Sequence, residues 1–364
     1  MLKPIKGRGS RVHLPGRFEV TTAEAVDDGW YAQEDEDFLA PALRTTVTEE
    51  TARSIISRNQ SPDIPFSQSA NPYRGCEHGC SYCFARPSHA YLNLSPGLDF
   101  ETRLFAKTNA PELLRHELGK PGYVPSPIAL GINTDAYQPI ERRLQLTRRM
   151  IEVLWETRHP FTLITKNALV VRDIDLLALL ARENLVSVHF SVTTLDPHLS
   201  AKLEPRAAAP HARLRAMRQL HEAGIPVGAM MAPVIPWIND AELEAIVEAV
   251  AQHGARTAGY ILLRLPHEVA PLFRDWLQAH YPDRAAHVMS TIQQLRGGKD
   301  YDSRFGHRFS GQGVYADLLQ RRFALAHRRA GFREDRYSGL DTTKFRRPER
   351  APAPRPPSPQ GELF

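Results

Sequence analysis

The chain has 364 residues, of which 42% are hydrophobic and 24% charged, and its formal net charge is +5. This length allows one large barrel as well as several small domains, and the sequence has no stretch near the ~18 consecutive apolar residues of a membrane span. The first seventeen residues hold five Lys or Arg and do not resemble a signal peptide. We therefore expect a soluble, cytoplasmic protein.

The first segment, residues 1–58, shows no sustained helical or strand periodicity, and acidic residues gather between Glu24 and Asp37. We predict an irregular N-terminal extension that lies over the main domain, which we place at residues 59–335.

The next segment, residues 71–87, reads NPYRGCEHGCSYCFARP and contains the only three cysteines of the chain, Cys76, Cys80 and Cys83. An odd number of thiols so close together cannot pair fully as internal disulfides, and a metal suits them better. Zinc is one solution, with His78 or His89 as a fourth ligand. An iron–sulfur cluster with three cysteinates and one open iron is the other.

The residues around these thiols are consistent with a wrapped cluster. Gly75 and Gly79 let the backbone pass close to it, and Tyr82 could pack against a flat ligand. We expect His78 to face solvent or backbone rather than to bind iron.

Beyond residue 128, short apolar runs alternate with helical patterns, which is typical of βαβ units around a parallel sheet. The predicted strands are 128–132, 161–165, 186–192, 226–234 and 260–265. The predicted helices are 141–157, 173–183, 210–223 and 239–254. A further strand before the cysteines gives six units.

The spacing Cys76-x-x-x-Cys80-x-x-Cys83, with Tyr82 before the last cysteine, resembles the signature of the radical S-adenosylmethionine (radical SAM) superfamily. The longer stretch NPYRGCEHGCSYCFARPSHAY resembles the subgroup related to spore photoproduct lyase, and the similarity runs from about residue 60 to about residue 335. The resemblance implies an α/β fold, a partial (β/α)6 TIM barrel of the radical SAM type. It also implies a [4Fe-4S] cluster, S-adenosyl-L-methionine, and an external electron donor of the flavodoxin or ferredoxin type.

In this superfamily the open iron chelates S-adenosylmethionine, and one electron cleaves the sulfonium to methionine and a 5′-deoxyadenosyl radical. Chemistry in such barrels lies at the carboxyl ends of the strands. The side chains that we expect to contact the cofactor are Tyr82, Asn133, Thr134, Asp135, Lys166, Ser191, Thr193, Glu204 and Arg206.

These assignments differ in their basis. Asn133, Thr134 and Asp135 stand where the superfamily often has Gly-Gly-Glu, so the contact to the amine is not fixed. Lys166 and Ser191 resemble cofactor contacts of the photoproduct-lyase group, through the carboxylate and the ribose respectively. Lys166 could instead be an ordinary rim lysine, and Glu204 with Arg206 could be a structural ion pair.

The substrate is less clear from the sequence. The resemblance implies a DNA lesion, but photoproduct lyase uses a further cysteine as hydrogen donor, and this chain has none. Tyr73, Tyr137 and Tyr301 are the candidate donors. Radical modification of a protein or small molecule is an alternative, as is a non-enzymatic zinc or iron–sulfur binding protein.

Two C-terminal features favour nucleic acid. The segment 296–313 interleaves Lys299, Arg304 and Arg308 with Tyr301 and Phe305, which suits phosphates and bases, although a charged connection needs no ligand. Residues 321–355 carry eleven Lys or Arg against four acidic residues, a distribution that suits either phosphate contact or a solvated end.

The last segment, residues 336–364, reads as a disordered, basic, Pro-rich tail. It ends in QGELF, Gln360 to Phe364, which resembles the short peptide by which bacterial DNA-processing proteins dock on the sliding clamp.

Overall fold

The computed structural model of the protein describes residues 5–18, 43–332 and 339–348. Its main sheet has seven strands in the order β10-β9-β8-β7-β6-β3-β2. The strands are β2 (Ile56–Arg58), β3 (Gln68–Ala70), β6 (Ile128–Leu130), β7 (Phe161–Thr165), β8 (Val186–Ser191), β9 (Val227–Val234) and β10 (Thr257–Leu262). All neighbours pair in parallel except β2, which is antiparallel to β3. Six parallel strands in chain order confirm the predicted α/β architecture, and the open order is that of a partial barrel.

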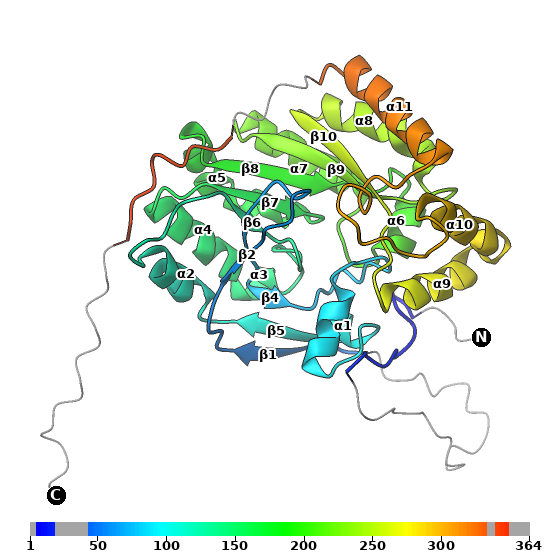
Figure 1. Cartoon of the computed structure of the whole chain (residues 1–364). Coiled ribbons are helices and arrows are strands. Elements are labelled where there is room, and N and C mark those ends of the chain that lie inside the picture. Colours follow the sequence, from blue (N-terminus) through cyan, green and yellow to red (C-terminus); the bar gives the residue numbers. More distant parts are fainter. Residues whose placement is uncertain (1–4, 19–42, 333–338, 349–364) are drawn as a thin grey trace, which may run out of the picture.

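Helices connect the parallel strands and lie outside the sheet, while the carboxyl ends of the strands lie toward the middle of the molecule (Figure 1). The connecting helices are α2 (Ala110–Leu118), α4 (Leu146–Glu156), α5 (Ile174–Arg182), α7 (Pro210–Glu222) and α8 (Leu243–Gln252). After β10 follow α9 (Val269–His280), α10 (Pro282–Leu295) and α11 (Val314–Arg329), the last of which packs on α8. No helix among the described residues is long and apolar enough to cross a bilayer.

The predicted helix 141–157 is two helices, α3 (Glu141–Leu144) and α4, separated by Gln145. Gln145 has a left-handed backbone with φ 52°, which ends a helix. The Glu141 carboxylate then accepts bonds from the backbone N–H groups of Thr147 and Arg148, at 3.0 Å and 3.3 Å, and so begins α4.

A second, three-stranded sheet joins β1 (Thr46–Glu50), β5 (Arg103–Lys107) and β4 (Tyr73–Arg74). The predicted irregular extension 1–58 therefore contributes two strands, β1 and β2. Neither could be recognised from its own pattern, because each is three to five residues long and is defined by a partner far along the chain.

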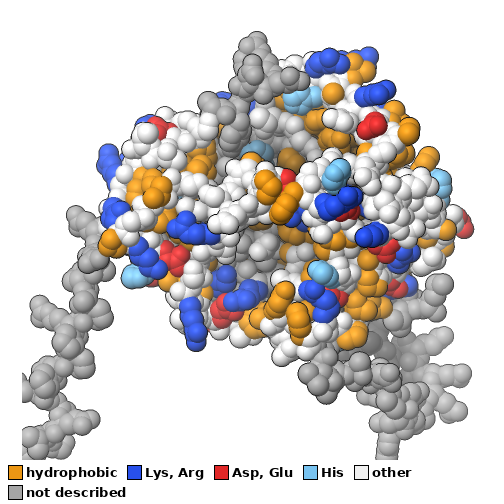
Figure 2. Space-filling model, viewed as in Figure 1, with side chains coloured by type: hydrophobic (Ala, Val, Ile, Leu, Met, Phe, Trp, Pro, Cys, Tyr) orange, Lys and Arg blue, Asp and Glu red, His pale blue; other side chains and the backbone are white. Residues whose placement is uncertain are grey.

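Among the described residues the core has one large cluster under the helices and three smaller ones, of which one contains Cys80 and another contains Cys76. The cluster with Cys80 combines it and Tyr82 with Leu263, Phe273 and Trp276. One wall of the cysteine loop is thus built by the elements that follow β10. The face drawn in Figure 2 is hollowed near the middle of the molecule, with basic and hydrophobic side chains around the hollow.

Part of the predicted C-terminal tail docks on the body. The backbone N–H of Arg346 donates to the carbonyl of Thr157 at 2.7 Å, and the Phe345 ring lies 5.4 Å from the ring of His159 and 5.6 Å from that of Tyr123. Composition alone predicts disorder here because it does not reveal this aromatic anchor. The pentapeptide Gln360–Phe364 and Arg350 lie outside the described residues.

Candidate active site

The cysteine loop begins where β3 ends, at the carboxyl edge of the main sheet. Gly75 and Gly79 have φ of +74° and +65°, and a Cβ on Gly75 would lie 2.8 Å from the Leu104 side chain. The loop is held because the backbone N–H of Cys76 donates to the carbonyl of Phe100 at 2.9 Å. Both predicted glycine positions are therefore required by the turn.

The three thiols are free, with Cys76 and Cys80 buried and Cys83 half-buried. Burial raises the pKa of the Cys80 thiol to about 12, although the charge of Lys166 acts in the opposite direction. Thiolates at this depth need a strong positive partner, and a coordinated metal deprotonates its thiol ligands. The donor set therefore fits a metal centre.

The two candidate metal centres place different demands on the three thiols. Among the described residues, no three His, Cys, Asp or Glu side chains come close enough together to hold one metal ion. A zinc ion would need its ligands within ~2.3 Å of one point, whereas cysteinates of an iron–sulfur cluster bind different irons. Of the two proposed histidine ligands, His89 has its Nε2 3.0 Å from the carbonyl of Arg103, while its buried Nδ1 has no hydrogen-bond partner among the described residues.

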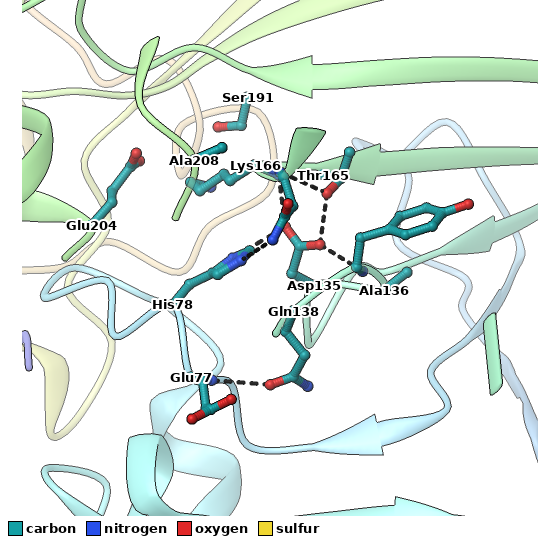
Figure 3. Close-up of polar contacts among 12 residues, drawn as sticks. Glu77, His78, Asp135, Ala136, Gln138, Thr165, Lys166, Ser191, Glu204 and Ala208 are labelled. Carbon is teal, nitrogen blue, oxygen red and sulfur yellow. Dashed lines mark hydrogen bonds and ion pairs between the residues drawn. The ribbon is translucent and has the colours of Figure 1, made fainter. Parts of the chain in front are cut away.

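His78 is buried, and its ring contacts side chains rather than solvent or backbone. Nδ1 lies 3.3 Å from an oxygen of Asp135, and Nε2 lies 3.3 Å from the amide nitrogen of Asn167 (Figure 3). The expected exposed position of His78 is therefore wrong. The His78 ring connects the cysteine loop to the ends of β6 and β7. The sequence does not show this role, because the Asp135 carboxylate that the ring contacts is distant along the chain.

Asp135 fixes the geometry at the ends of β6 and β7. Its carboxylate accepts from the Thr165 hydroxyl and the Lys166 backbone N–H, each at 2.7 Å, and from the backbone N–H of Tyr137 at 2.9 Å (Figure 3). Burial would raise the pKa of Asp135, but the His78 ring and these bonds lower it to about 2. Its neighbours differ: Asn133 is exposed, and Thr134 is buried with its hydroxyl 3.3 Å from the carbonyl of Tyr73.

Glu204 is the second buried carboxylate of the site. It accepts from the Tyr82 hydroxyl and, at 2.6 Å, from the Thr193 hydroxyl, and it forms an ion pair with Arg213. Burial would raise the pKa of Glu204, but Arg213 and Lys166 lower it to about 2. Glu204 is thus a fixed negative charge between two cations.

Glu204 and Arg206, for which an ion pair was the alternative to cofactor contact, do not pair with each other. Arg206 instead contacts Glu77 at 3.1 Å, and Arg213 from α7 takes its place at Glu204. Arg213 was not predicted because it reads as one of several arginines in an amphipathic helix. The feature that distinguishes Arg213 from the other arginines is its fully buried guanidinium group, and only the folded structure shows that burial.

Lys166 and Ser191 lie at the ends of β7 and β8, where the sequence predicts them. The Lys166 ammonium is 5.9 Å from the centre of the Tyr82 ring. Burial would lower the pKa of Lys166, but Cys80 and Glu204 raise it. The Ser191 hydroxyl is buried and lies 3.4 Å from the carbonyl of Ala232. Figure 3 shows Lys166, Ser191 and Glu204 around one space.

The three candidate hydrogen donors occupy different environments. The hydroxyl of Tyr73 donates to Glu141, and that of Tyr137 donates to Asp173 at 2.9 Å, so both are committed to buried carboxylates. Tyr301 is half-buried, and no hydrogen-bond partner of its hydroxyl is found among the described residues.

The fold and the cysteine loop define a class, since a six-stranded parallel sheet carries three clustered thiols at its carboxyl edge. Residues 70–250 match the family described as the radical SAM superfamily. This stretch of the chain is thus similar to a radical SAM domain, and superfamily members use a [4Fe-4S] cluster and S-adenosylmethionine.

Proteins of other organisms are similar to this chain in sequence. The uncharacterized protein Rv2578c of Mycobacterium tuberculosis is 38% identical over 222 residues, which are 60% of this chain and 65% of that protein. The uncharacterized protein MJ0683 of Methanocaldococcus jannaschii is 26% identical over 58% of this chain and 76% of that protein. The chain thus spans about 65% of the length of its mycobacterial relatives.

Among solved structures, spore photoproduct lyase complexed with a dinucleoside spore photoproduct superposes with a TM-score of 0.54 at 16% identity, covering 78% of this chain and 79% of that one. A photoproduct lyase variant with bound AdoMet and the same dinucleoside gives 0.53 at 14% identity over the same shares. This similarity confirms the predicted fold.

Proposed function

We propose that the protein is a radical SAM enzyme that reductively cleaves S-adenosylmethionine and acts on nucleic acid. The observation that carries the proposal is the gathering of Cys76, Cys80 and Cys83 in the loop at the carboxyl edge of the sheet, where the charges of Lys166 and Glu204 act on Cys80. When bound there, a [4Fe-4S] cluster with S-adenosylmethionine supplies a one-electron cleavage that yields methionine and a 5′-deoxyadenosyl radical.

The residues of the chain position and charge this site. Lys166 offers a cation for the cofactor's carboxylate, which is a strong, charge-assisted contact. Glu204, fixed by Arg213, holds Tyr82 in place next to Cys83. Asp135 and His78 hold the cysteine loop against the sheet. The small cluster around Cys80 excludes water from the thiols.

Nucleic acid is the substrate class that we favour, in a repair or modification reaction like that of photoproduct lyase. The shared fold and the basic, aromatic segment 296–313 support it. The chain has no fourth cysteine, so a substrate or product radical needs another hydrogen donor. Tyr301 suits this role better than Tyr73 or Tyr137, whose hydroxyls are bound to carboxylates.

Anaerobic reconstitution with iron, sulfide and a strong reductant tests the activity. The protein should then convert S-adenosylmethionine to 5′-deoxyadenosine. A zinc protein, or an iron–sulfur protein without catalysis, would retain its metal and leave the cofactor intact.

Deuterium transfer tests the substrate class. Cofactor deuterated at the 5′ carbon should exchange label with an oligonucleotide that carries a candidate lesion, detected by mass spectrometry. If 5′-deoxyadenosine forms but no label exchanges with any oligonucleotide, the alternative of a protein or small-molecule substrate replaces this proposal.

A further inference from the structure

Five side chains form an alternating series of aromatic rings and guanidinium groups, which we name the arginine–aromatic ladder. Arg264 lies 4.7 Å from the ring centre of Phe84 and 4.8 Å from that of Phe309. Arg308 lies 4.8 Å from the ring centre of Phe309 and 4.9 Å from that of Phe305. Such contacts fix planar groups against one another.

The ladder leads from the cysteine loop to the surface. Phe84 directly follows Cys83, and Arg264 lies two residues beyond the end of β10. Phe309 is anchored because its carbonyl accepts from the backbone N–H of Leu262 at 2.9 Å. The rings at the two ends are accessible, since Phe84 is 42% exposed and Phe305 is 54% exposed. In Figure 1 the segment between α10 and α11, which carries Phe305 and Phe309, crosses the middle of the molecule beside the strand ends.

The charges along the ladder are not balanced. Arg308 is neutralised by Asp63, whose carboxylate accepts from its Nε at 2.8 Å. Arg264 has no hydrogen bond or ion pair with any described residue. The adjacent Arg296 is 2% exposed, and within the described part of the chain its guanidinium donates only to the backbone carbonyls of His307, Leu262 and Leu263.

Asp63 and Asp302 act on Arg264 and Arg296 only through their charge, and two neighbouring cations without a directly paired carboxylate are costly where they are buried or partly buried. Burial lowers the pKa of both groups, to about 10 for Arg296; the charge of Arg308 further lowers the pKa of Arg264, and the charge of Arg264 further lowers that of Arg296. An anion that reached Arg264 would lower this free-energy cost, because it would accept the hydrogen bonds that the planar guanidinium group of Arg264 can donate.

We propose that the ladder is the substrate platform of the enzyme, and that it takes an unpaired nucleotide with a phosphate at Arg264 and bases stacked on the exposed rings. This rests on the proposed function, because it places a nucleic acid next to Cys83. Accessible ring faces interleaved with arginines suit single-stranded or extruded bases, which present both a π-face and a phosphate. An acidic peptide would satisfy the charge but would leave the rings without planar partners.

Binding of a fluorescent oligothymidylate, measured by anisotropy with the reconstituted full chain, tests the platform. Arg264→Ala should weaken binding about tenfold or more and lower the salt slope by about 0.7, the value for one phosphate on a single strand. Phe305→Leu should weaken binding about fivefold or more while leaving the slope unchanged, because a flat face is lost but no charge.

Arg274→Ala is the matched control, since it removes an exposed arginine of α9 that pairs with Asp300 at 2.7 Å and lies outside the ladder. It should bind as the parent does. Arg264→Lys keeps the charge without the planar fork, so it should retain the slope but lose affinity, which separates a binding defect from misfolding.

The platform is overturned if Arg274→Ala loses as much affinity as Arg264→Ala, or if Phe305→Leu binds as the parent does. Equal competition by polyglutamate and unlabelled oligothymidylate would also reject it, because charge alone would then explain binding. The assay does not depend on cofactor cleavage, so failure of the platform and failure of the proposed radical chemistry are distinguishable.

Discussion

Lys166, at the end of β7, has a tyrosine ring as a neighbour, and the charge of the Glu204 carboxylate acts on its ammonium group. If its ammonium holds the carboxylate of S-adenosylmethionine, Lys166→Ala should weaken cofactor binding by roughly 1.5–3 kcal/mol, about 10- to 150-fold, and leave the cluster absorbance intact. Anaerobic equilibrium dialysis measures the affinity. Lys202→Ala is the control, because that lysine also lies over a tyrosine ring, Tyr281 at 4.7 Å, but is not among the charges that act on Cys80 or Glu204. Equal affinity in both variants would make Lys166 an ordinary rim residue.

His159 should make the stability of the fold pH-dependent. Burial lowers its pKa to about 4; Nδ1 donates to the carbonyl of Pro160 at 2.9 Å, and Nε2 lies 2.7 Å from the Tyr123 hydroxyl. The unfolded state binds the proton more readily, so stability is full above pH ~6.5 and is lost as pH falls toward 4. At pH 5 the loss from this one group is about 2 kcal/mol.

Urea denaturation at pH 7 and pH 5 checks this. His159→Gln should be less stable at pH 7 but should lose less stability on acidification than the parent does. His198→Gln, which changes an exposed histidine on α6 (Pro197–Leu203), should follow the parent. A His159→Gln variant with the parent's full pH dependence would reject the argument.

The sequence was sufficient to identify the polar residues at the strand ends, but not the side chains with which they form ion pairs. Sequence reasoning found Asp135, Lys166 and Glu204, because polar residues directly after apolar runs stand out. Its alternative role for Glu204 was an ion pair with the nearby Arg206, whereas the fold supplies Arg213 from the next helix. Pairings of this kind depend on tertiary distances, which sequence separation does not give.

At the scale of elements, a buried ion pair holds the cysteine loop to the start of the chain. Arg86 and Glu101 are both fully buried and paired, and the Nε of Arg86 donates to the carbonyl of Cys80 at 2.9 Å. The Glu101 carboxylate also accepts from the backbone N–H groups of Gly9 and Ser10, each at 2.9 Å. Residues 5–18 are thereby fixed against the loop.

Glu101→Ala leaves a buried arginine unpaired and should destabilise the protein by about 3–5 kcal/mol, with lower iron content after reconstitution. Glu156→Ala breaks the exposed pair with Arg115 and should cost at most ~1 kcal/mol. Chemical denaturation and iron analysis measure both effects. Similar losses in the two variants would show that the Arg86–Glu101 pair does not hold the loop.

The elements with strong periodicity were predicted within a few residues, as β7 and α7 show. The shortest strands were missed. β1 and β2 exist because β5 and β3 offer them edges to pair with, and a sequence window does not contain those edges.

At the scale of the whole molecule, the alternation of strands and helices was sufficient to predict six parallel strands. It did not predict how the two ends of the chain attach. Residues 5–18 dock through Glu101, and residues 339–348 dock through Phe345; both contacts join segments that are distant in sequence. The clamp-binding assignment of Gln360–Phe364 stays a prediction.

The central claim is that three cysteines hold one catalytic cluster. Cofactor cleavage by the separate variants Cys76→Ala, Cys80→Ala and Cys83→Ala, reconstituted anaerobically beside the parent, tests it most directly. We predict that each variant loses the iron–sulfur absorbance and the formation of 5′-deoxyadenosine together, because each cysteinate binds its own iron. Cofactor cleavage at the parent's rate by any one of the three would contradict the account.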